Sequence, residues 1–429
     1  MRTEFKYVRT AILSCALGFM VVNTGYADGY RNPPPTAEGI GKSGANMVFV
    51  DDASAIFYNP ANLADLDSAS AVLGLTLARS ETTYTSGYPL PAVSPEDDWV
   101  ALPNLFIGAP IGTNGLAVGL GISTPFGQGT TYNKNDLVNI PGFLLGVPPA
   151  IHEGTIALIN FNPTVAYRIN DSVSIAVGAD LFYSTLNFKQ FYPWSAIGPI
   201  PPFGTPPDQD VEADGDGYGF GGNAAITWNL TDKQKLALTY RSEVKVEYEG
   251  DLTVQPSGVP FPPLPLLNSS SFAMDITYPT EIGAGYGIVL AEDIRLEASL
   301  VWTEWSVNQS LNADLGVNGT LAVPQNWEDT FVYRIGGDWQ LDENWNICAG
   351  YAFIENPIPN STMAPVLPDA DRHALSLGFG YTTGSHTFDA AYTFSIFDDV
   401  DISLAENRAF PGSYDIASDL LGLTYSYSF

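Results

Sequence analysis

Apolar and polar residues alternate one by one along much of this chain, which is the pattern of a β-strand whose two faces meet different surroundings. The alternation is plain in residues 387–396 and 236–249. At the C-terminal end it is carried by large side chains separated by glycine, serine and threonine: Leu421, Leu423, Tyr425, Tyr427 and Phe429. Several of these segments are much longer than the ~5–6 residues of an average soluble strand.

About fourteen such segments follow one another, and an even number is the rule for bacterial outer-membrane barrels. They begin near Ser68, Asp98, Gly115, Thr155, Val173, Val211, Gln234, Ser269, Asp293, Glu328, Trp345, Asp371, Ser385 and Tyr414. Short turns rich in Asn, Asp and Gly, which tight reversals need, join alternate pairs at residues 170–171, 231–233, 291–292, 342–344 and 383–384. We place these turns at the periplasmic end and the longer connections at the outer end.

A soluble β-sandwich shows the same alternation, because one face packs on a core and the other meets water. The N-terminus favours a membrane barrel instead. Basic residues within 2–9 precede an apolar run at 11–22, and Gly25 and Ala27 supply the small side chains of a cleavage site. The run is shorter than the ~20 residues that span a bilayer. Residues 1–27 are therefore predicted to be an export signal.

Strands of an exported chain can lie in lipid in only one way. Lipid offers no partners for backbone polar groups, so strands cross it as a closed barrel. Aromatic residues cluster at strand ends, as the interfacial girdles of such barrels require, and the last strand ends in Phe429. We predict an all-β transmembrane barrel of about fourteen antiparallel strands over residues 68–429, located in the bacterial outer membrane.

Residues 28–67, ahead of the first predicted strand, are rich in glycine and weakly helical in pattern. A disordered leader is one interpretation. A segment with so many apolar side chains seldom stays in water, however, and a barrel lumen offers a place to bury them. We predict that this segment is a hatch that plugs the lumen. Residues 39–43 have part of a phosphate-loop pattern, but Thr36 replaces its first glycine and no strand precedes it, so no nucleotide site is expected.

Three of the outward connections are apolar, at residues 140–151, 191–203 and 259–267. Exposed apolar patches invite aggregation unless they bind something or pack together. We expect a groove that binds a hydrophobic small molecule, lined by Phe143, Leu144, Leu145, Ile151, Phe191, Trp194, Ile197 and Phe203. The alternative is that these loops pack on one another and cap the barrel, in which case they still form an apolar cleft.

The balance of acidic and basic residues limits the classes of molecule that this protein can bind. The 429 residues include 47 acidic and 17 basic ones, for a net charge of −30. A nucleic-acid binder needs a basic face, so that class is excluded. Outer-membrane lipid and a hydrophobic small molecule are the expected partners, and we expect a monomer. Because charges are costly on the lipid face of a barrel, Arg241, Glu243 and Lys245 are placed in the lumen.

No catalytic, cofactor or metal chemistry is expected. The three histidines are scattered without a nucleophile motif, so we expect no enzyme, although groups that converge only in space stay open. Alternating acids between Asp208 and Asp216 could hold calcium, but the rest of a calcium loop is missing and solvated acids are favoured. Cys348, which stands alone once the export signal is removed, is interpreted as a small apolar strand residue.

Several motifs resemble the FadL-type outer-membrane transporters of long-chain fatty acids and other hydrophobic compounds. Residues 236–245 are one, and Asp51-Asp52-Ala53 followed by Asn59-Pro60-Ala61 looks like the plug motif of that family. Further similarities lie at residues 333–335, 342–353, 357–359 and 368–372. They occur in matching order from residue 28 to residue 429, so the resemblance covers the whole mature chain.

The resemblance implies a fourteen-stranded barrel with an N-terminal hatch. We expect the turn at Asn59, Pro60 and Ala61 to set the position of the hatch, because Pro60 fixes its own φ and restricts the backbone of Asn59. The resemblance also implies that an outer apolar groove captures the substrate and passes it to a pocket beside the mature N-terminus, where Tyr30 lies. Release is then expected sideways, through a gap at a kinked third strand. Residues 115–129 supply the glycine and proline that weaken strand pairing there.

In the fatty-acid member of the family, basic residues from two strands help to bind the carboxylate. By alignment those positions hold Gln190 and Val323 here, with Lys189 beside the first. Neutral hydrocarbons and aromatics therefore stay open beside fatty acids. We expect the inner pocket to prefer neutral substrates unless Lys189, Lys245 or Arg241 pairs with the anion. The alternative function is a plugged barrel that acts as a general porin or surface adhesin.

Overall fold

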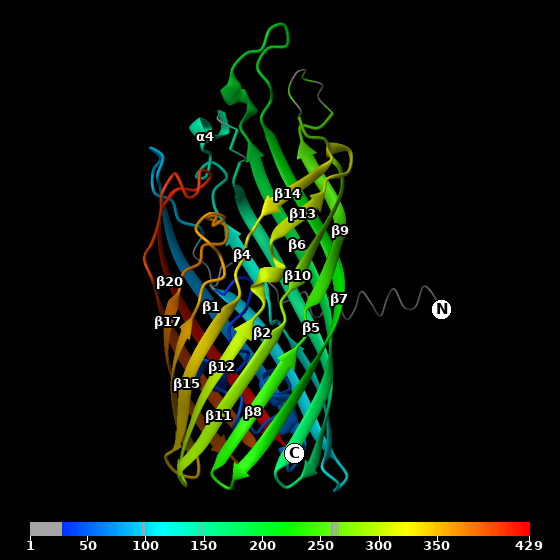
Figure 1. Ribbon diagram of the computed structural model, residues 1–429, viewed down its shortest axis with the longest axis vertical. Helices are drawn as coiled ribbons and strands as arrows, with labels where there is room; N and C mark the ends of the chain where they lie inside the picture. The colour runs from blue at the N-terminus through cyan, green and yellow to red at the C-terminus, as the bar shows by residue number, and fades with distance from the viewer. Residues whose placement is uncertain are drawn as a thin grey trace, which may run out of the picture.

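The computed structural model describes residues 28–96, 99–144, 146–147, 149–258, 261, 264 and 266–429. The predicted export signal and Leu145 lie outside these residues. Among the described residues, no helix is long and apolar enough to cross a membrane. Strands dominate instead, and they form one continuous sheet (Figure 1).

The sheet is antiparallel and closes on itself, because β1 pairs with both β2 and β20. Where two strand segments follow one another in the same wall, they count as one, and the result is a closed barrel of fourteen strands, as predicted. The segments are β1 (Ser70–Ser86), β2 (Val100–Ile111), β3 (Leu116–Ser123), β4 (Gly127–Thr131), β5 (Ile151–Asn170), β6 (Val173–Tyr192), β7 (Gln209–Thr231), β8 (Gln234–Arg241), β9 (Val244–Gln255), β10 (Ser270–Tyr278), β11 (Glu281–Ala291), β12 (Ile294–Thr303), β13 (Ser310–Asp314), β14 (Thr320–Pro324), β15 (Thr330–Gln340), β16 (Trp345–Ile354), β17 (Arg372–Thr383), β18 (His386–Phe397), β19 (Val400–Ile402) and β20 (Gly412–Ser428).

Tight turns gather at one end of the barrel and long connections at the other (Figure 1). The five tight turns predicted from the sequence all lie between paired strands, for example at the β5–β6 and β17–β18 reversals. The long connections carry four short helices: α4 (Ile140–Leu144), η2 (Trp194–Ile197), η3 (Trp305–Val307) and η4 (Gly316–Asn318). The described residues of the apolar loops singled out in the sequence lie at this end.

The outer face of the wall is apolar. Leu73 of β1, Phe379 of β17 and Phe388 of β18 are each more than half exposed. In water such a surface would aggregate, whereas in a bilayer these side chains meet hydrocarbon. The exposed apolar belt is therefore what a membrane-spanning barrel requires.

Between β8 and β9 the even-numbered residues change from the outer face of the wall to the lumenal face. The even-numbered Leu238 and Tyr240 are about half exposed on the outer face. Beyond the break at residues 242–243, the even-numbered Val244 and Val246 are buried in the lumenal core. The continuous alternation expected through residues 236–249 is wrong, because the break shifts the register by one residue and exchanges the two faces.

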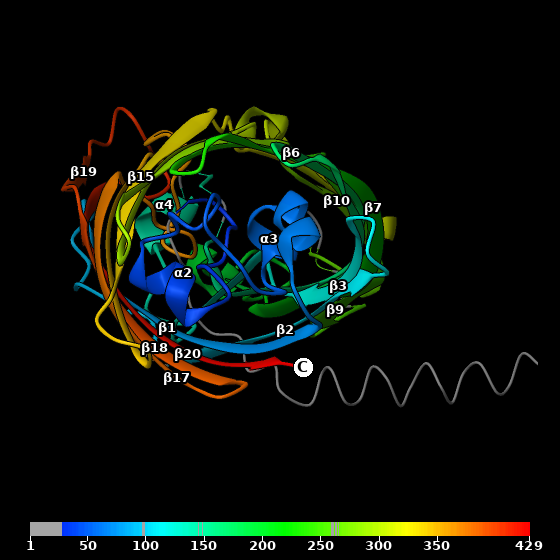
Figure 2. The ribbon, with the colours of Figure 1, turned by 90° about the horizontal axis from the view of Figure 1, so that it is seen from below.

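The hatch, residues 28–67, lies inside the barrel (Figure 2). It carries three short helices: α2 (Ala37–Gly41), α3 (Ala55–Tyr58) and η1 (Pro60–Asp65). Ile56 and Leu63 are fully buried and pack in one cluster with Phe106 of β2. The apolar content of this segment is thus removed from water, as its composition predicts.

A row of glycines lets the hatch approach the wall closely. Gly283, Gly285 and Gly287 of β11 face hatch residues 47–49. A Cβ at Gly285 would fall 2.9 Å from Val48 Cγ2, closer than side chains tolerate. The absence of side chains on this face therefore makes room for the hatch backbone.

Candidate functional site

The outer loops converge on an apolar pocket at the loop end of the barrel, here named the outer pocket. Its lining includes Leu137, Phe143, Val147, Phe191, Pro193 and Phe410. The Phe143 ring lies 5.2 Å from the Trp194 ring, and Lys134 Nζ lies 5.0 Å from the Phe191 ring. The structure thus brings Phe143 of one apolar connection together with Phe191 and Trp194 of another.

The other described loop residues expected in the groove lie apart from the outer pocket. Leu144 is more than half exposed, and Ile197 is exposed as well. Phe203 is about half exposed, and its ring packs 5.9 Å from the ring of Phe261. Ile151 is the first residue of β5. The apolar loops therefore form two separate contacts rather than one continuous lining.

Lys189 does not face the lumen. In β6 the even-numbered residues, such as Leu186, belong to the lumenal core, so Lys189 lies on the opposite face. Its Nζ pairs with Glu153 at 2.7 Å and with Glu212 at 3.9 Å. The expectation that Lys189 could bind a substrate carboxylate is therefore corrected, because strand parity turns it outward and two acids occupy it.

Five aromatic rings meet in the upper lumen and form the inner aromatic cluster: Tyr30, Phe126, Tyr278, Trp305 and Trp327. Tyr30 is 3% exposed, and its ring lies 4.8 Å from Trp327 and 6.2 Å from Trp305. The Phe126 ring lies 4.9 Å from Tyr278. These buried rings make this part of the lumen apolar and aromatic.

Of these residues, sequence reasoning found Tyr30 alone. Phe126 lies in the break between β3 and β4, and Trp305 and Trp327 lie in the connections on either side of the β13–β14 hairpin. No spacing rule joins residues that are so far apart in sequence. Their one common signal is that each is a large aromatic residue at a strand interruption, where a side chain can turn into the lumen.

A row of polar residues lies on neighbouring wall strands, with Arg31 of the hatch against it, and is here named the polar belt: Arg31, Asp180, Asn223, Arg241, Glu281 and Thr303. The strand register brings these residues side by side, since Arg241 is paired with Asn223 on one neighbouring strand and with Glu281 on the other. Arg31 donates to Glu281 Oε1 at 2.7 Å and to Thr303 Oγ1 at 2.9 Å. Arg241 pairs with the fully buried Asp180. These buried charges are paired, as burial demands.

The predicted set of lumenal charges is therefore only partly right. Arg241 faces the lumen as expected. Lys245 lies on the outer face with a half-exposed side chain, and it pairs with Asp275 at 2.7 Å and Glu247 at 3.2 Å. Glu243 lies in the break between β8 and β9. The parity shift at that break is the reason that Lys245 faces outward.

The wall is interrupted between β3 and β4, and here the hatch completes it. Asn32 N donates to the carbonyl oxygen of Pro125 at 2.9 Å, and Gly127 N donates to the carbonyl oxygen of Tyr30 at 2.8 Å. Asn32 Nδ2 also donates to the carbonyl oxygen of Thr124 at 2.9 Å. Hatch residues 30–32 thus act as a short strand that covers this interruption, which we name the wall gap (residues 124–127).

The motif Asn59-Pro60-Ala61 lies at a buried turn of the hatch. Asn59 Oδ1 accepts the backbone N–H of Ala61 and so caps η1, and Pro60 occupies its first turn. Asn59 Nδ2 donates to Thr227 Oγ1 of β7 at 2.8 Å and to the carbonyl oxygen of Met47 at 2.9 Å. The motif therefore joins two parts of the hatch to the wall.

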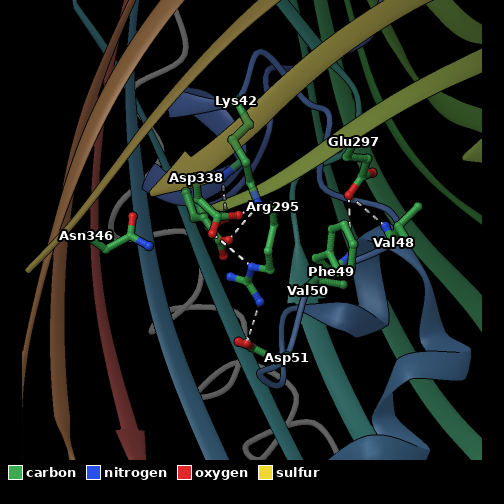
Figure 3. Close-up of polar contacts among 12 residues, drawn as sticks. Lys42, Val48, Phe49, Val50, Asp51, Arg295, Glu297, Asp338 and Asn346 are labelled. Atoms are coloured by element: carbon green, nitrogen blue, oxygen red, sulfur yellow. Dashed lines mark hydrogen bonds and ion pairs between the residues drawn. The ribbon is translucent and has the colours of Figure 1, made fainter. Parts of the chain in front are cut away.

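One carboxylate of the wall holds three consecutive backbone N–H groups of the hatch (Figure 3). Glu297 of β12 accepts from Met47, from Val48 at 3.0 Å and from Phe49 at 3.3 Å. Glu297 is 2% exposed. A buried carboxylate that accepts several N–H groups is a strong, directional anchor.

A network of charges fixes the neighbouring part of the hatch (Figure 3). Lys42 Nζ pairs with Glu38 at 2.7 Å and lies 3.8 Å from Asp338 of β15. Arg295 of β12 bridges Asp338, at 2.8 Å, and the hatch residue Asp51, at 3.3 Å. Each buried cation has an acidic partner, so the network stabilises the hatch position without an uncompensated charge.

The first described residues of the hatch are anchored to a loop. Asp369, in the connection between β16 and β17, accepts the backbone N–H groups of Asp28 at 2.9 Å and Gly29 at 3.2 Å. Burial raises the pKa of Asp369 to about 7, against the lowering effect of the Asp28 N–H group. Trp305 Nε1 donates to Asp28 Oδ1 at 3.1 Å, which links this anchor to the inner aromatic cluster.

Two of the acids between Asp208 and Asp216 contact protein groups. Asp208 accepts from the backbone and hydroxyl of Ser195, and Asp210 pairs with Lys134 at 3.0 Å. Among the described residues, no group of histidine, cysteine and acidic side chains has the arrangement of a metal site. The geometry offers binding surfaces for apolar molecules and a barrier of paired charges.

Comparisons with known proteins agree with this geometry. One family profile, described as outer membrane protein transport protein (OMPP1/FadL/TodX), matches residues 19–429. The long-chain fatty acid transport protein of Escherichia coli O6:H1 is 25% identical over 447 residues, which cover 96% of each chain.

Solved structures show the same fold. The crystal structure of a Pseudomonas aeruginosa FadL homologue matches with a TM-score of 0.79 at 22% identity, over 94% of this chain and 100% of its own. The toluene transporter TodX of Pseudomonas putida matches with a TM-score of 0.72 at 17% identity, over 94% of this chain and 99% of its own. Because the family profile spans nearly the whole chain, this protein belongs to the FadL/TodX family of outer-membrane transport proteins.

Proposed function

We propose that this protein takes up hydrophobic molecules across the outer membrane by passive diffusion. The substrate binds first in the outer pocket, moves to the inner aromatic cluster, and leaves sideways into the bilayer through the wall gap. One observation carries this route: hatch residues 30–32 close the wall gap, and Tyr30 of the same segment belongs to the inner aromatic cluster. A substrate that displaces Tyr30 therefore also loosens the closure.

The physical reason for a sideways exit is the free-energy cost of exposing a hydrophobic molecule to water. A hydrophobic molecule keeps about 0.8 kcal/mol for each methylene group that stays out of water. A route from outer pocket to aromatic cluster to bilayer avoids the aqueous periplasm throughout. The names of the relatives, a long-chain fatty acid transport protein and a toluene transporter, support an apolar cargo. The whole route lies in one barrel, so a monomer suffices, and no step needs catalysis.

A disulfide across the wall gap tests this proposal. Arg31 and Phe126 are opposite each other in an antiparallel pairing whose hydrogen bonds lie on either side, which is the pairing with the shorter Cα separation. That separation suits a disulfide. Arg31→Cys combined with Phe126→Cys should block uptake of an alkyl or aromatic probe when oxidised and restore it after reduction.

The reduced double variant is its own control, and each single cysteine variant controls for the loss of one side chain. Undiminished uptake with the disulfide formed would show that the wall gap is not the exit. A general porin would also respond differently, because its ion conductance in planar bilayers would persist in both redox states. The proposed route predicts that conductance is nearly absent in either state.

A further inference from the structure

A hollow of about 510 Å³, here named the wall hollow, lies on the outer face of the barrel wall. It crosses β1, β20, β18, β17 and β16, which pair in that order, and Figure 2 shows the first four of these strands together on one side of the barrel. Its volume falls within the ~300–1,000 Å³ of ligand pockets. Its apolar lining includes Leu75, Phe379, Phe388, Ala390, Leu423 and Tyr425.

The wall is concave here because one small side chain stands among large ones. Ala390 of β18 is exposed on the outer face. It is paired with Phe379 on β17 and with Leu423 on β20, and both of these side chains also point outward. Large side chains therefore flank a single methyl group, which forms the floor of the wall hollow.

Two pairs of aromatic rings border the wall hollow on the side of the tight turns. Tyr381 and Phe388 are paired across β17 and β18, but each ring has its aromatic neighbour on the far side. The Tyr381 ring lies 4.7 Å from Trp345, and the Phe388 ring lies 5.3 Å from Tyr425. The two ring pairs therefore stand on opposite sides of the wall hollow.

The wall hollow opens at the level of the tight turns. Trp345 is the first residue of β16, directly after the turn at residues 342–344, and Tyr381 lies two residues before the end of β17. Aromatic side chains at the ends of barrel strands mark the height at which hydrocarbon meets the lipid headgroups. The wall hollow therefore runs from the headgroup level into the hydrocarbon.

The rim at this level carries negative charge. Asp342 Oδ1 accepts the backbone N–H groups of Asn344 at 2.8 Å and of Trp345 at 2.9 Å, which holds the carboxylate beside a lining residue. These N–H groups keep the pKa of Asp342 below its ordinary value, so it is ionised at neutral pH. Glu343 follows in the same turn. The lining and the turns at residues 342–344 and 383–385, all within the described part of the chain, contain no lysine or arginine.

A second copy of the chain does not suit the wall hollow. In a two-fold symmetric pair the same patch meets itself, so one hollow would face another and neither would be filled. Apolar surfaces in a bilayer also gain no hydrophobic driving force by pairing, because lipid tails are as apolar as the side chains. A flexible acyl chain, in contrast, can follow a concave surface and make the dispersion contacts that the small Ala390 leaves open.

We propose that the wall hollow binds a membrane phospholipid whose headgroup carries an ammonium group, such as phosphatidylethanolamine. One acyl chain lies over Ala390 between the two ring pairs, and the ammonium group reaches the carboxylates of Asp342 and Glu343. An anionic phospholipid has the same acyl chains, but these carboxylates repel its headgroup. The site is separate from the uptake route, so it stands or fails independently of the proposed function.

The headgroup is tested by native mass spectrometry of the purified full-length protein, released from vesicles of equimolar phosphatidylethanolamine and phosphatidylglycerol with identical acyl chains. The unmodified protein should retain phosphatidylethanolamine about fivefold more than phosphatidylglycerol, the factor that one charge near a membrane surface contributes. Asp342→Asn combined with Glu343→Gln should bring the retained lipids close to the equimolar ratio. Asparagine keeps an oxygen that can accept the Trp345 N–H, so the turn is preserved.

The acyl chain is tested by filling the wall hollow. Ala390→Trp places a ring over its floor and should lower the amount of retained lipid about tenfold, the equivalent of one large apolar contact. Ala349→Trp is the matched control, because Ala349 is exposed on the outer face of β16 but does not line the wall hollow. It should leave the retained lipid unchanged. The different migration of heated and unheated barrels on gels checks that each variant assembles.

Three results would overturn the proposal. Equal retention by the Ala390→Trp and Ala349→Trp variants would show that the lipid does not occupy the wall hollow. A ratio of the two phospholipids that the double change at the turn leaves unaltered would show that the rim acids do not recognise the headgroup. A dimer of the unmodified protein that Ala390→Trp dissociates would assign the wall hollow to a second copy of the chain.

Discussion

Asn32 of the hatch donates its backbone N–H to the carbonyl oxygen of Pro125 across 2.9 Å, at the point where the barrel wall is interrupted. The hatch thereby pairs with the wall as well as lying inside the barrel. The next hydrogen bond of the pair runs from Gly127 to Tyr30, whose ring lies among the rings of the inner aromatic cluster. The inner aromatic cluster and the closure of the wall gap are therefore linked through Tyr30 and Asn32, which lie two positions apart in the hatch.

The outer pocket should depend on Trp194 and not on Leu144. Trp194→Asp places a charge beside the Phe143 ring, so we expect the substrate concentration for half-maximal uptake to rise about tenfold, the equivalent of one large apolar side chain covered by substrate. Leu144→Asp is the matched control, because Leu144 is exposed outside the outer pocket. Equal effects of the two changes would show that general loop polarity, rather than this pocket, sets capture.

Removal of the Glu297 carboxylate should loosen the hatch. Glu297→Ala leaves three buried N–H groups of the hatch without their acceptor, at about 1–3 kcal/mol for each unsatisfied group. We expect higher conductance in planar bilayers and greater antibiotic sensitivity, with unchanged barrel assembly on gels. Glu247→Ala, on the outer face, is the control. If even deletion of residues 29–64 leaves conductance unaltered, the hatch does not seal the lumen.

The anchor at Asp369 should weaken as the pH rises. The folded protein holds the carboxyl proton up to a pKa of about 7, whereas the unfolded chain releases it near its ordinary value of 3.8. The stabilising contribution is therefore complete in acid and is lost as the pH rises through about 7. Hydrogen-exchange protection of the Gly29 amide, which donates to Asp369, and of the Asn32 amide should be lower at pH 8 than at pH 6. Asp369→Asn should remove this pH dependence, and an unchanged dependence in that variant would assign it to another group.

The barrel itself could be predicted from the sequence, because period-two alternation and polar turns are local signals that many strands repeat. Which face of a strand a residue occupies is harder to predict. In residues 236–249 nothing local marks the break at residues 242–243, so the alternation alone predicts the wrong face for Lys245. A strand interruption of this kind becomes visible only through the cross-strand pairing of its neighbours, such as Val244 with Tyr278.

The site was less predictable than the fold, because its parts come from separate segments. Phe143 and Trp194 could be predicted because they lie in apolar loops. The aromatic neighbours of Tyr30 could not, since the fold of their loops places Trp305 and Trp327 beside it.

The glycine row of β11 makes the hatch and the wall a matched pair. A side chain at Gly283, Gly285 or Gly287 would clash with hatch residues 47–49, so a substitution there would have to be accompanied by a change in those hatch residues. On the opposite face of the same strand, Ile282 and Tyr286 meet lipid and are free to vary among apolar residues. A hatch transplanted from a relative would therefore need to bring this strand with it, and the two segments should be inherited as a unit although more than two hundred residues separate them.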